Sequence, residues 1–189
     1  MKHEINSQNT KKMLAETLLS LLESKPLSKI TVSEIVNKCD INRKTFYYHF
    51  ADVYDLLEWH LNTELQKALI FTDPLDDLNT TITYSMNYMN DNTYLRNCID
   101  DPFGRDKIIN FLNKSLYPKA IEMINELEQR YAKSLEPDFK DFLIRSLGRV
   151  TVLSIIDAIE NPTVYDIERM KLYLSNVFNA SIEGFFQKL

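Results

Sequence analysis

The segment at residues 43–49 concentrates side chains that can bind a polyanion. It reads RKTFYYH and holds two cations, a hydroxyl group, two amphipathic tyrosine rings and an imidazole. Arg and Lys donate hydrogen bonds to phosphate oxygens and to base edges, and guanine O6 and N7 are their commonest specific targets in DNA. These residue types favour the binding of nucleic acid over a catalytic reaction.

A short helix is expected just before this segment, beginning at about Val32. Thr31 and Glu34 have the spacing of a capping box, which satisfies the free N–H groups at a helix start. Apolar residues then recur at three- and four-residue spacing and give the helix one buried face. The pattern stops at Asp40, the expected turn residue, because Asp tolerates left-handed backbone better than most side chains.

A second short helix is expected from its N-cap, Asn42, to His49 or Phe50. Phe46 and Phe50 are four residues apart and therefore point to the same side, into the core. The remaining surface carries Arg43, Lys44, Thr45, Tyr47, Tyr48 and His49. Two short helices joined by a tight polar turn have the layout of a helix-turn-helix.

The sequence TFYYHF at residues 45–50 is a close variant of the T-x-Y-Y-x-H-F stretch of the TetR family of bacterial transcriptional regulators. The chain resembles this family over about residues 10–60, where DVYDLLEWHL is similar to the start of the family's connecting helix. DLLEWHL also resembles the branch that includes dihydroxyacetone kinase regulators, some of which are co-activators. The resemblance implies an all-α, TetR-like fold: a three-helix helix-turn-helix DNA-binding domain at 1–52, and a helical ligand-binding and dimerisation domain at 53–189.

Two residues depart from the family pattern. Asp40 stands where the family usually has a turn glycine, and Val53 replaces a Lys that is common at the start of the connecting helix. The second change removes one expected phosphate contact. Binding to phosphate is therefore expected to depend more on Arg43, Lys44 or the amino-terminal arm.

The resemblance also assigns roles within the helix-turn-helix. Thr45 and Tyr47 are expected to enter the DNA groove, and the two residues after Tyr47 to hold phosphates. Thr31 and Ser33, at the amino end of the preceding helix, suit a phosphate oxygen. The predicted DNA-binding residues are Thr31, Ser33, Asn42, Arg43, Lys44, Thr45, Tyr47, Tyr48 and His49. For either tyrosine, packing against the protein is the open alternative.

Net charge is distributed unevenly along the 189 residues. The whole chain carries −5, but residues 1–50 hold eight Lys/Arg against five Asp/Glu, or +3, and the rest holds 14 against 22, or −8. The positive part coincides with the helix-turn-helix, where a local positive field attracts phosphate. Charge alone leaves open the alternative of a chance asymmetry in an ordinary solvated surface.

An all-helical chain is expected because apolar residues repeat at three and four and only three glycines occur. Beyond the helix-turn-helix, helices are expected near 8–23, 52–71, 76–91, 93–101, 105–116, 118–134, 138–160 and 163–187. Asp73-Pro74 is the expected hinge between the DNA-binding and regulatory parts. No stretch approaches the ~20 apolar residues of a membrane span, and the bacterial cytoplasm is the expected location.

The last two expected helices have apolar residues on more than one face and must be covered on two sides. Near 138–160, the residues expected to face the subunit core are Leu143, Leu147, Val150 and Ile156, and a second line holds Gly148, Thr151, Ile155 and Ala158. In TetR-like proteins these two helices pair with their copies across a two-fold axis, so the resemblance implies a homodimer. Central core helices of a monomer are the alternative.

Motifs for catalysis or metal binding do not emerge from the sequence. There is no Gly-rich phosphate loop, GxSxG elbow or HExxH, and the three histidines are scattered. Cys39 and Cys98 have no CxxC partner and are expected to be small buried side chains. Carboxylate pairs at 76–77 and 100–101 adjoin proline-marked breaks, where helix capping or a solvated loop is expected. No catalytic residue, metal or cofactor is expected.

Aromatic residues of the second domain could line a pocket for a small-molecule effector, although packing in the core is the alternative. The candidates are Trp59, Tyr84, Tyr88, Phe103 and Tyr117. The sequence as a whole predicts a ligand-responsive transcriptional repressor that binds a palindromic DNA operator as a homodimer. The alternatives are a TetR-like co-regulator that acts through a protein partner with little DNA affinity of its own, and then a helical enzyme or carrier.

Overall fold

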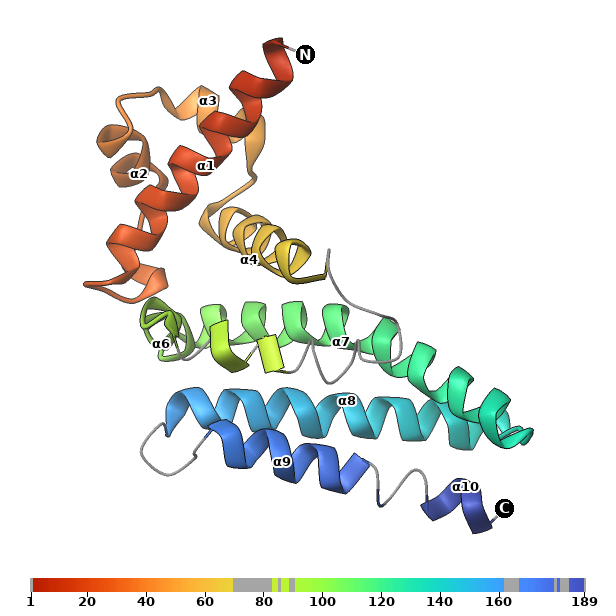
Figure 1. Ribbon diagram of the computed structural model, residues 1–189. Helices are drawn as coiled ribbons and strands as arrows, with labels where there is room; N and C mark the ends of the chain where they lie inside the picture. The colour runs from red at the N-terminus through yellow and green to blue at the C-terminus, as the bar shows by residue number, and fades with distance from the viewer. Residues whose placement is uncertain are drawn as a thin grey trace. The chain divides into compact units, whose positions relative to one another are not determined.

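Helices make up the computed structural model of the protein (Figure 1). It describes residues 2–69, 83–84, 86–88, 91–161, 167–178, 180 and 184–188, and none of these residues lies in a strand. The all-α prediction is confirmed. Contacts group the chain into two compact units, Met1–Lys67 with Asn92–Phe111 and Ala68–Asp91 with Leu112–Leu189. The functional division predicted at residue 52 stays a prediction.

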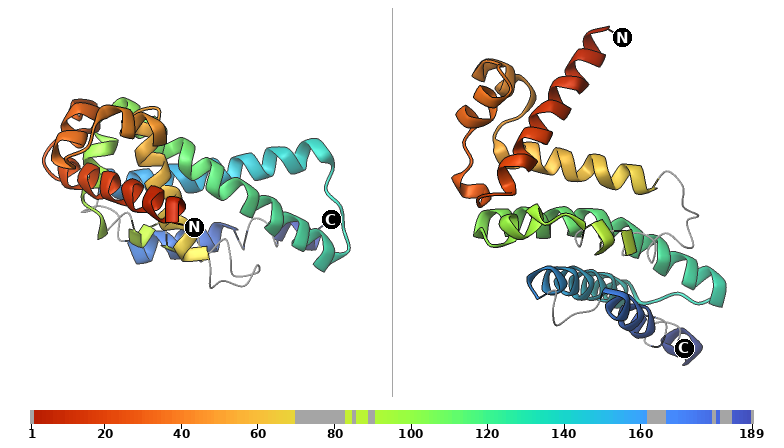
Figure 2. Two further views of the ribbon diagram at one scale, coloured as in Figure 1. Left: turned by 90° about the horizontal axis from the view of Figure 1, so that it is seen from above. Right: turned by 60° about the vertical axis from the view of Figure 1, so that its left-hand side comes forward.

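The first unit contains the predicted helix-turn-helix. Its helices are α1 (Lys2–Leu22), a 3-10 turn η1 (Leu27–Lys29), α2 (Val32–Lys38), α3 (Arg43–His49) and α4 (Val53–Leu69). The bounds of α2 and α3 confirm the two predicted short helices, and Figure 2 shows both beside α1. Helix α1 begins earlier than predicted because no Gly or Pro precedes Pro26 to stop it. Its four predicted inward-facing leucines are all buried: Leu14, Leu18, Leu21 and Leu22.

Helix α6 (Tyr94–Ile99) belongs to the first unit although it lies far along the chain. The side-chain amide of Asn97 donates a 2.7 Å hydrogen bond to the carbonyl of Leu22, at the end of α1. Buried Tyr94 shares a 3.2 Å hydrogen bond between its hydroxyl and His60 Nε2 on α4. These two bonds tie α6 to both long helices of the unit.

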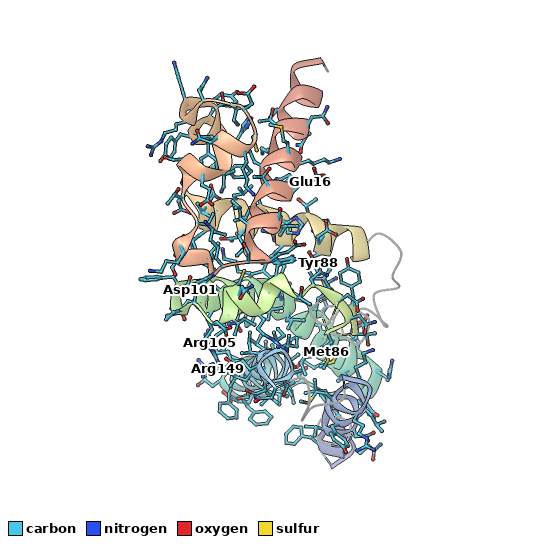
Figure 3. All side chains as sticks on the ribbon, turned by 90° about the vertical axis from the view of Figure 1, so that its left-hand side faces the viewer. Glu16, Met86, Tyr88, Asp101, Arg105 and Arg149 are labelled. Carbon is cyan, nitrogen blue, oxygen red and sulfur yellow. The ribbon has the colours of Figure 1, made fainter. Side chains whose placement is uncertain are left out.

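Helix α7 (Pro102–Tyr131) starts with a close contact to the end of α6. Buried Asp101 accepts a 3.1 Å hydrogen bond from the backbone N–H of Gly104 (Figure 3). A Cβ at Gly104 would lie 2.3 Å from the carbonyl oxygen of Cys98, so only glycine fits. Cys98 is fully buried as predicted, and burial raises the pKa of its thiol to about 12. Cys39 is only half-buried, so its predicted burial is wrong in degree.

A single helix α7 replaces the two helices predicted at 105–116 and 118–134. Pro118 lies inside it and is exposed. Proline removes one intrahelical hydrogen bond, which favours a break. The buried residues Leu116 and Ala120 flank Pro118, so packing carries the helix across it. The prediction of a break was therefore wrong because tertiary contacts outweigh local propensity here.

The second unit contains the rest of α7 with α8 (Pro137–Glu160), α9 (Ile167–Phe178) and α10 (Gly184–Lys188). Helix α8 confirms the helix predicted near 138–160. Helix α9 and all but the last residue of α10 fall in the range of the single helix predicted at 163–187, part of which lies outside the described residues. The Asp73-Pro74 hinge and most of the helix predicted at 76–91 also lie outside the described residues. No described helix has the length and apolar content needed to cross a bilayer.

The faces of α8 differ from the prediction. Val150 is 49% exposed, although it was expected in the subunit core. Three residues of the predicted second line, Thr151, Ile155 and Ala158, are buried within the chain itself. The residue spacing of one helix shows that it has two apolar faces, but it does not show which face is buried. The helices that pack against α8 determine that.

The turn between α7 and α8 is held by Glu128. Its carboxylate accepts hydrogen bonds from Lys140 at 2.6 Å and from the backbone N–H of Leu135 at 2.8 Å. Lys140 also donates to Asn125 at 2.7 Å. The Lys140 ammonium, then the Leu135 N–H, lowers the pKa of Glu128 below its usual range.

The close contact at Gly104 predicts a paired outcome for alanine substitutions. Gly104→Ala should lower the free energy of unfolding by roughly 1–3 kcal/mol, because the new methyl group meets backbone. Gly148→Ala, at an open position inside α8, should instead raise it by up to ~1 kcal/mol. Urea titration monitored by circular dichroism measures both. A Gly104→Ala protein as stable as the parent would contradict the contact.

The lowered pKa of Glu128 predicts a loss of stability in acid. Its ionised form stabilises the folded chain above the ordinary pKa of 4.5, and that contribution disappears as the pH falls through the lower folded value. Glu128→Gln should lower stability at pH 7 and flatten the decline below about pH 4.5. Glu126→Gln, on the same helix, is the control. The hypothesis fails if the two variants show the same pH dependence in urea titrations.

Candidate nucleic-acid interface

Local hydrogen bonds form the helix-turn-helix as predicted. Thr31 Oγ1 accepts from the N–H of Glu34 at 3.2 Å, which caps α2, and Asn42 Oδ1 accepts from the N–H of Thr45 at 2.8 Å, which caps α3. Between the helices, Asp40 has φ of 51°, in the left-handed region. The sequence therefore positions both ends of the turn through contacts between near neighbours.

Glu34 has a second role that the sequence did not indicate. Its carboxylate accepts from the Lys25 ammonium at 2.6 Å, across the 3-10 turn η1. Lys25, with a smaller contribution from the backbone N–H of Thr31, lowers the pKa of Glu34. This pair joins the start of α2 to the end of α1, and only the folded path of the intervening turn brings the two residues together.

An aromatic cluster fixes the inner face of α3. Phe46 and Phe50 are buried, and their ring centres lie 5.9 Å apart. Phe50 also contacts Trp59 of α4, with the rings 5.8 Å apart in an edge-to-face arrangement. Such contacts lock ring orientation as well as burying apolar area. These contacts therefore fix the rotation of α3 about its own axis, and with it the direction in which its outer face points.

The outer face of α3 is exposed and cationic. Tyr47 is 50% exposed and Tyr48 is 73% exposed, and Arg43 and Lys44 are also exposed. Arg43 donates a 3.2 Å hydrogen bond to the hydroxyl of Tyr47, and its guanidinium lies 5.8 Å from the centre of that ring. A pre-aligned Arg keeps other N–H groups available for an acceptor. Both tyrosine side chains remain at least half exposed.

His49 is half-buried at the edge of this face. Burial, and to a smaller extent the Lys11 ammonium, lowers the pKa of His49 from its ordinary value of 6.5. The ring is therefore neutral at pH 7 and can donate one N–H to a phosphate oxygen. Lys11 of α1 lies 5.7 Å and 5.8 Å from the ring centres of Phe50 and Trp59. Sequence reasoning missed Lys11, since only packing brings α1 to this point.

The other predicted positions occupy varied surroundings. Thr31 and Asn42 are exposed, and Ser33 and Thr45 are half-buried, so the hydroxyls lie at or near the surface. Val53 is buried, which places its side chain in the core. Within the described part of the chain, no group of three or more His, Cys, Asp or Glu side chains could hold a metal ion.

The five aromatic residues predicted for an effector pocket divide between the units. In the first, Trp59 belongs to the aromatic cluster, and Phe103 is 70% exposed with its ring 6.4 Å from that of Tyr54. In the second, Tyr84 and Tyr88 stack at 6.0 Å. Tyr117, 38% exposed, lines a groove between α7 and α8. Their role in effector binding stays a prediction.

Comparisons with known proteins identify the fold. No protein-family model and no curated protein matches the chain. Among solved structures, dihydroxyacetone kinase operon activator DhaS is similar with a TM-score of 0.69 at 18% identity, over 92% of this chain and 96% of that one. The fatty acid degradation regulator FadR from Bacillus halodurans gives 0.62 at 12% identity, over 88% and 93%. The chain shares the all-helical fold of these two proteins, with an amino-terminal helix-turn-helix and a carboxyl-terminal helical part.

Proposed function

We propose that this protein is a ligand-responsive transcriptional repressor that binds a palindromic DNA operator as a homodimer in the bacterial cytoplasm. The observation that carries the proposal is the outer face of α3, where Arg43, Lys44, Tyr47 and Tyr48 are exposed together. An enzyme or a plain scaffold has no need of this combination on one rigid helix. A DNA reader uses cations for base edges and phosphates, and hydroxyls for phosphates.

The arrangement within α3 supports distinct roles. Arg43 and Lys44 begin the helix, and the first residues of a recognition helix reach base edges in the major groove. Tyr48 and the neutral ring of His49 lie in its last turn and suit phosphate oxygens. The first group would then determine sequence preference, and the second would position the helix on the duplex.

Exposed apolar residues on α8 and α9 support the dimer. Six apolar residues of these helices are about half exposed or more: Phe142, Val150, Leu153, Leu172, Tyr173 and Val177. The two helices pack against each other within the second unit (Figure 1), so these residues lie on one helix pair. A single exposed apolar residue is ordinary, but six on two packed helices indicate an interaction surface. We propose that a second copy covers it.

A co-regulator that acts through a protein partner is the second candidate. Two observations favour it: the net charge of −5, and the burial of Val53 where related proteins often have a phosphate-binding Lys. The structurally similar DhaS is named an operon activator, which is compatible with either mode. The two candidates differ in whether α3 alone gives the protein measurable affinity for DNA.

The roles within α3 predict two classes of DNA-binding defect. On a site selected by the protein from random duplexes, Arg43→Ala or Lys44→Ala should cost about 1–3 kcal/mol per subunit and relax preference at one symmetric position. Tyr48→Phe should weaken binding to all duplexes about equally. Fluorescence anisotropy at several salt concentrations measures both, and affinity should fall with salt.

The matched control for these variants is Lys29→Ala, in η1 of the same unit, outside α3. Lys29→Ala removes one positive charge, as Arg43→Ala and Lys44→Ala do, but leaves the outer face of α3 unchanged. Equal losses for Arg43→Ala and Lys29→Ala would reject base reading. Wild-type protein without affinity for any duplex at low salt would favour the co-regulator.

The exposed apolar surface predicts that charge placed there separates the subunits without unfolding them. Leu153→Asp or Val177→Asp should convert a dimer into a folded monomer, because each residue is about half exposed in the single chain. Ile155→Asp should instead unfold the chain, since that side chain is buried. Sedimentation velocity with circular dichroism distinguishes the outcomes. A wild-type monomer at tens of micromolar would end the proposal.

A further inference from the structure

A basic groove lies between α7 and α8 in the second unit. Six residues line it: Asn113, Lys114, Tyr117, Arg145, Gly148 and Arg149. Its volume is about 470 Å³, within the roughly 300–1,000 Å³ common for small-molecule sites. We call it the α7–α8 groove. Figure 3 shows Arg149 on α8.

The charge of the groove favours an anion. Three lining residues are cationic and none is acidic. Asp141 outside the lining accepts a 2.7 Å hydrogen bond from Arg145 Nε, which leaves the terminal guanidinium nitrogens of Arg145 available. Arg149 makes no hydrogen bond or ion pair with another described residue. Cations gathered along one groove attract anionic ligands.

Gly148 and Tyr117 give the groove room and a flat wall. A Cβ at Gly148 would meet no described atom within 4 Å, so neighbouring side chains do not explain a glycine in the middle of α8. Glycine weakens a helix interior, but here it lets another molecule approach the backbone closely. The half-exposed ring of Tyr117 offers an apolar surface beside the cations.

We propose that the α7–α8 groove binds a small organic acid, a carboxylate or phosphate ester that carries a flat apolar group. Arg149 and Arg145 bind the acid through their guanidinium N–H groups, which match the oxygens of such groups. The apolar group lies against Tyr117 and Gly148. Only the role of this acid as the effector rests on the proposed function; its binding in the groove does not. A second copy is a poorer occupant, since two-fold symmetry would repeat the same cations at a shared contact.

Isothermal titration of the full chain with phenyl phosphate and with benzoate tests the site, and benzyl alcohol is the uncharged comparison. We expect saturable binding of at least one anion below about 10 mM and none of the alcohol. Arg149→Glu should weaken binding about tenfold or more by reversing a charge, and Gly148→Leu should do so by filling the space without a charge change. Arg130→Glu, exposed near the end of α7, is the matched charge control.

Three results would overturn the proposal. The first is no saturable binding of either anion. The second is equal weakening by Arg130→Glu, which indicates nonspecific attraction to cations. The third is unchanged binding in Gly148→Leu together with a shift to monomer in sedimentation, which makes the groove a subunit contact. Circular dichroism confirms that each variant is folded. Because no DNA is used, failure here leaves the DNA-binding proposal standing, and failure of DNA binding leaves this site standing.

Discussion

Burial of Phe46 against Phe50, and of Phe50 against Trp59, is the interaction on which the proposed function depends most. Replacing a buried Phe by Ala typically costs about 3–5 kcal/mol, comparable to much of the stability of a small domain. Helix α3 has only seven residues, too few to be stable alone, so this cluster maintains it. The same contacts set its rotation and turn its cations and tyrosines outward. Reading DNA on this surface requires a rigid aromatic core beneath it.

The first unit also extends the influence of this core beyond the helix-turn-helix. Hydrogen bonds from Asn97 to Leu22 and between His60 and Tyr94 join α6 to α1 and α4. Gly104 then permits the tight passage from α6 into α7. These contacts join α6 and the start of α7 to α1 and α4 within the first unit.

Local chemistry explains which parts of the structure the sequence predicts. The caps at Thr31 and Asn42 and the turn at Asp40 depend on residues within three positions of one another, and all were predicted. Two other contacts depend on the folded path of the chain and were not predicted. They are the ion pair of Lys25 with Glu34 and the position of Lys11 over the ring of Phe50. Pro118 predicts a helix break from local propensity, but the burial of its neighbours Leu116 and Ala120 carries α7 across it. The prediction of the inward side of α8 was wrong for the same reason. The cations of the α7–α8 groove come from two helices, so their proximity is apparent only from the structure.

We propose that two copies of α3, one from each subunit, read one DNA site together. The recognition helices of such a dimer must enter successive major grooves about 34–36 Å apart, so two half-sites centred roughly 10 base pairs apart are required. The most direct measurement is the mass and affinity of the complex on duplexes that carry the selected site with two half-sites or with one. Two chains per duplex, with affinity that collapses when one half-site is scrambled, is the predicted result. One chain per duplex with unchanged affinity would contradict it.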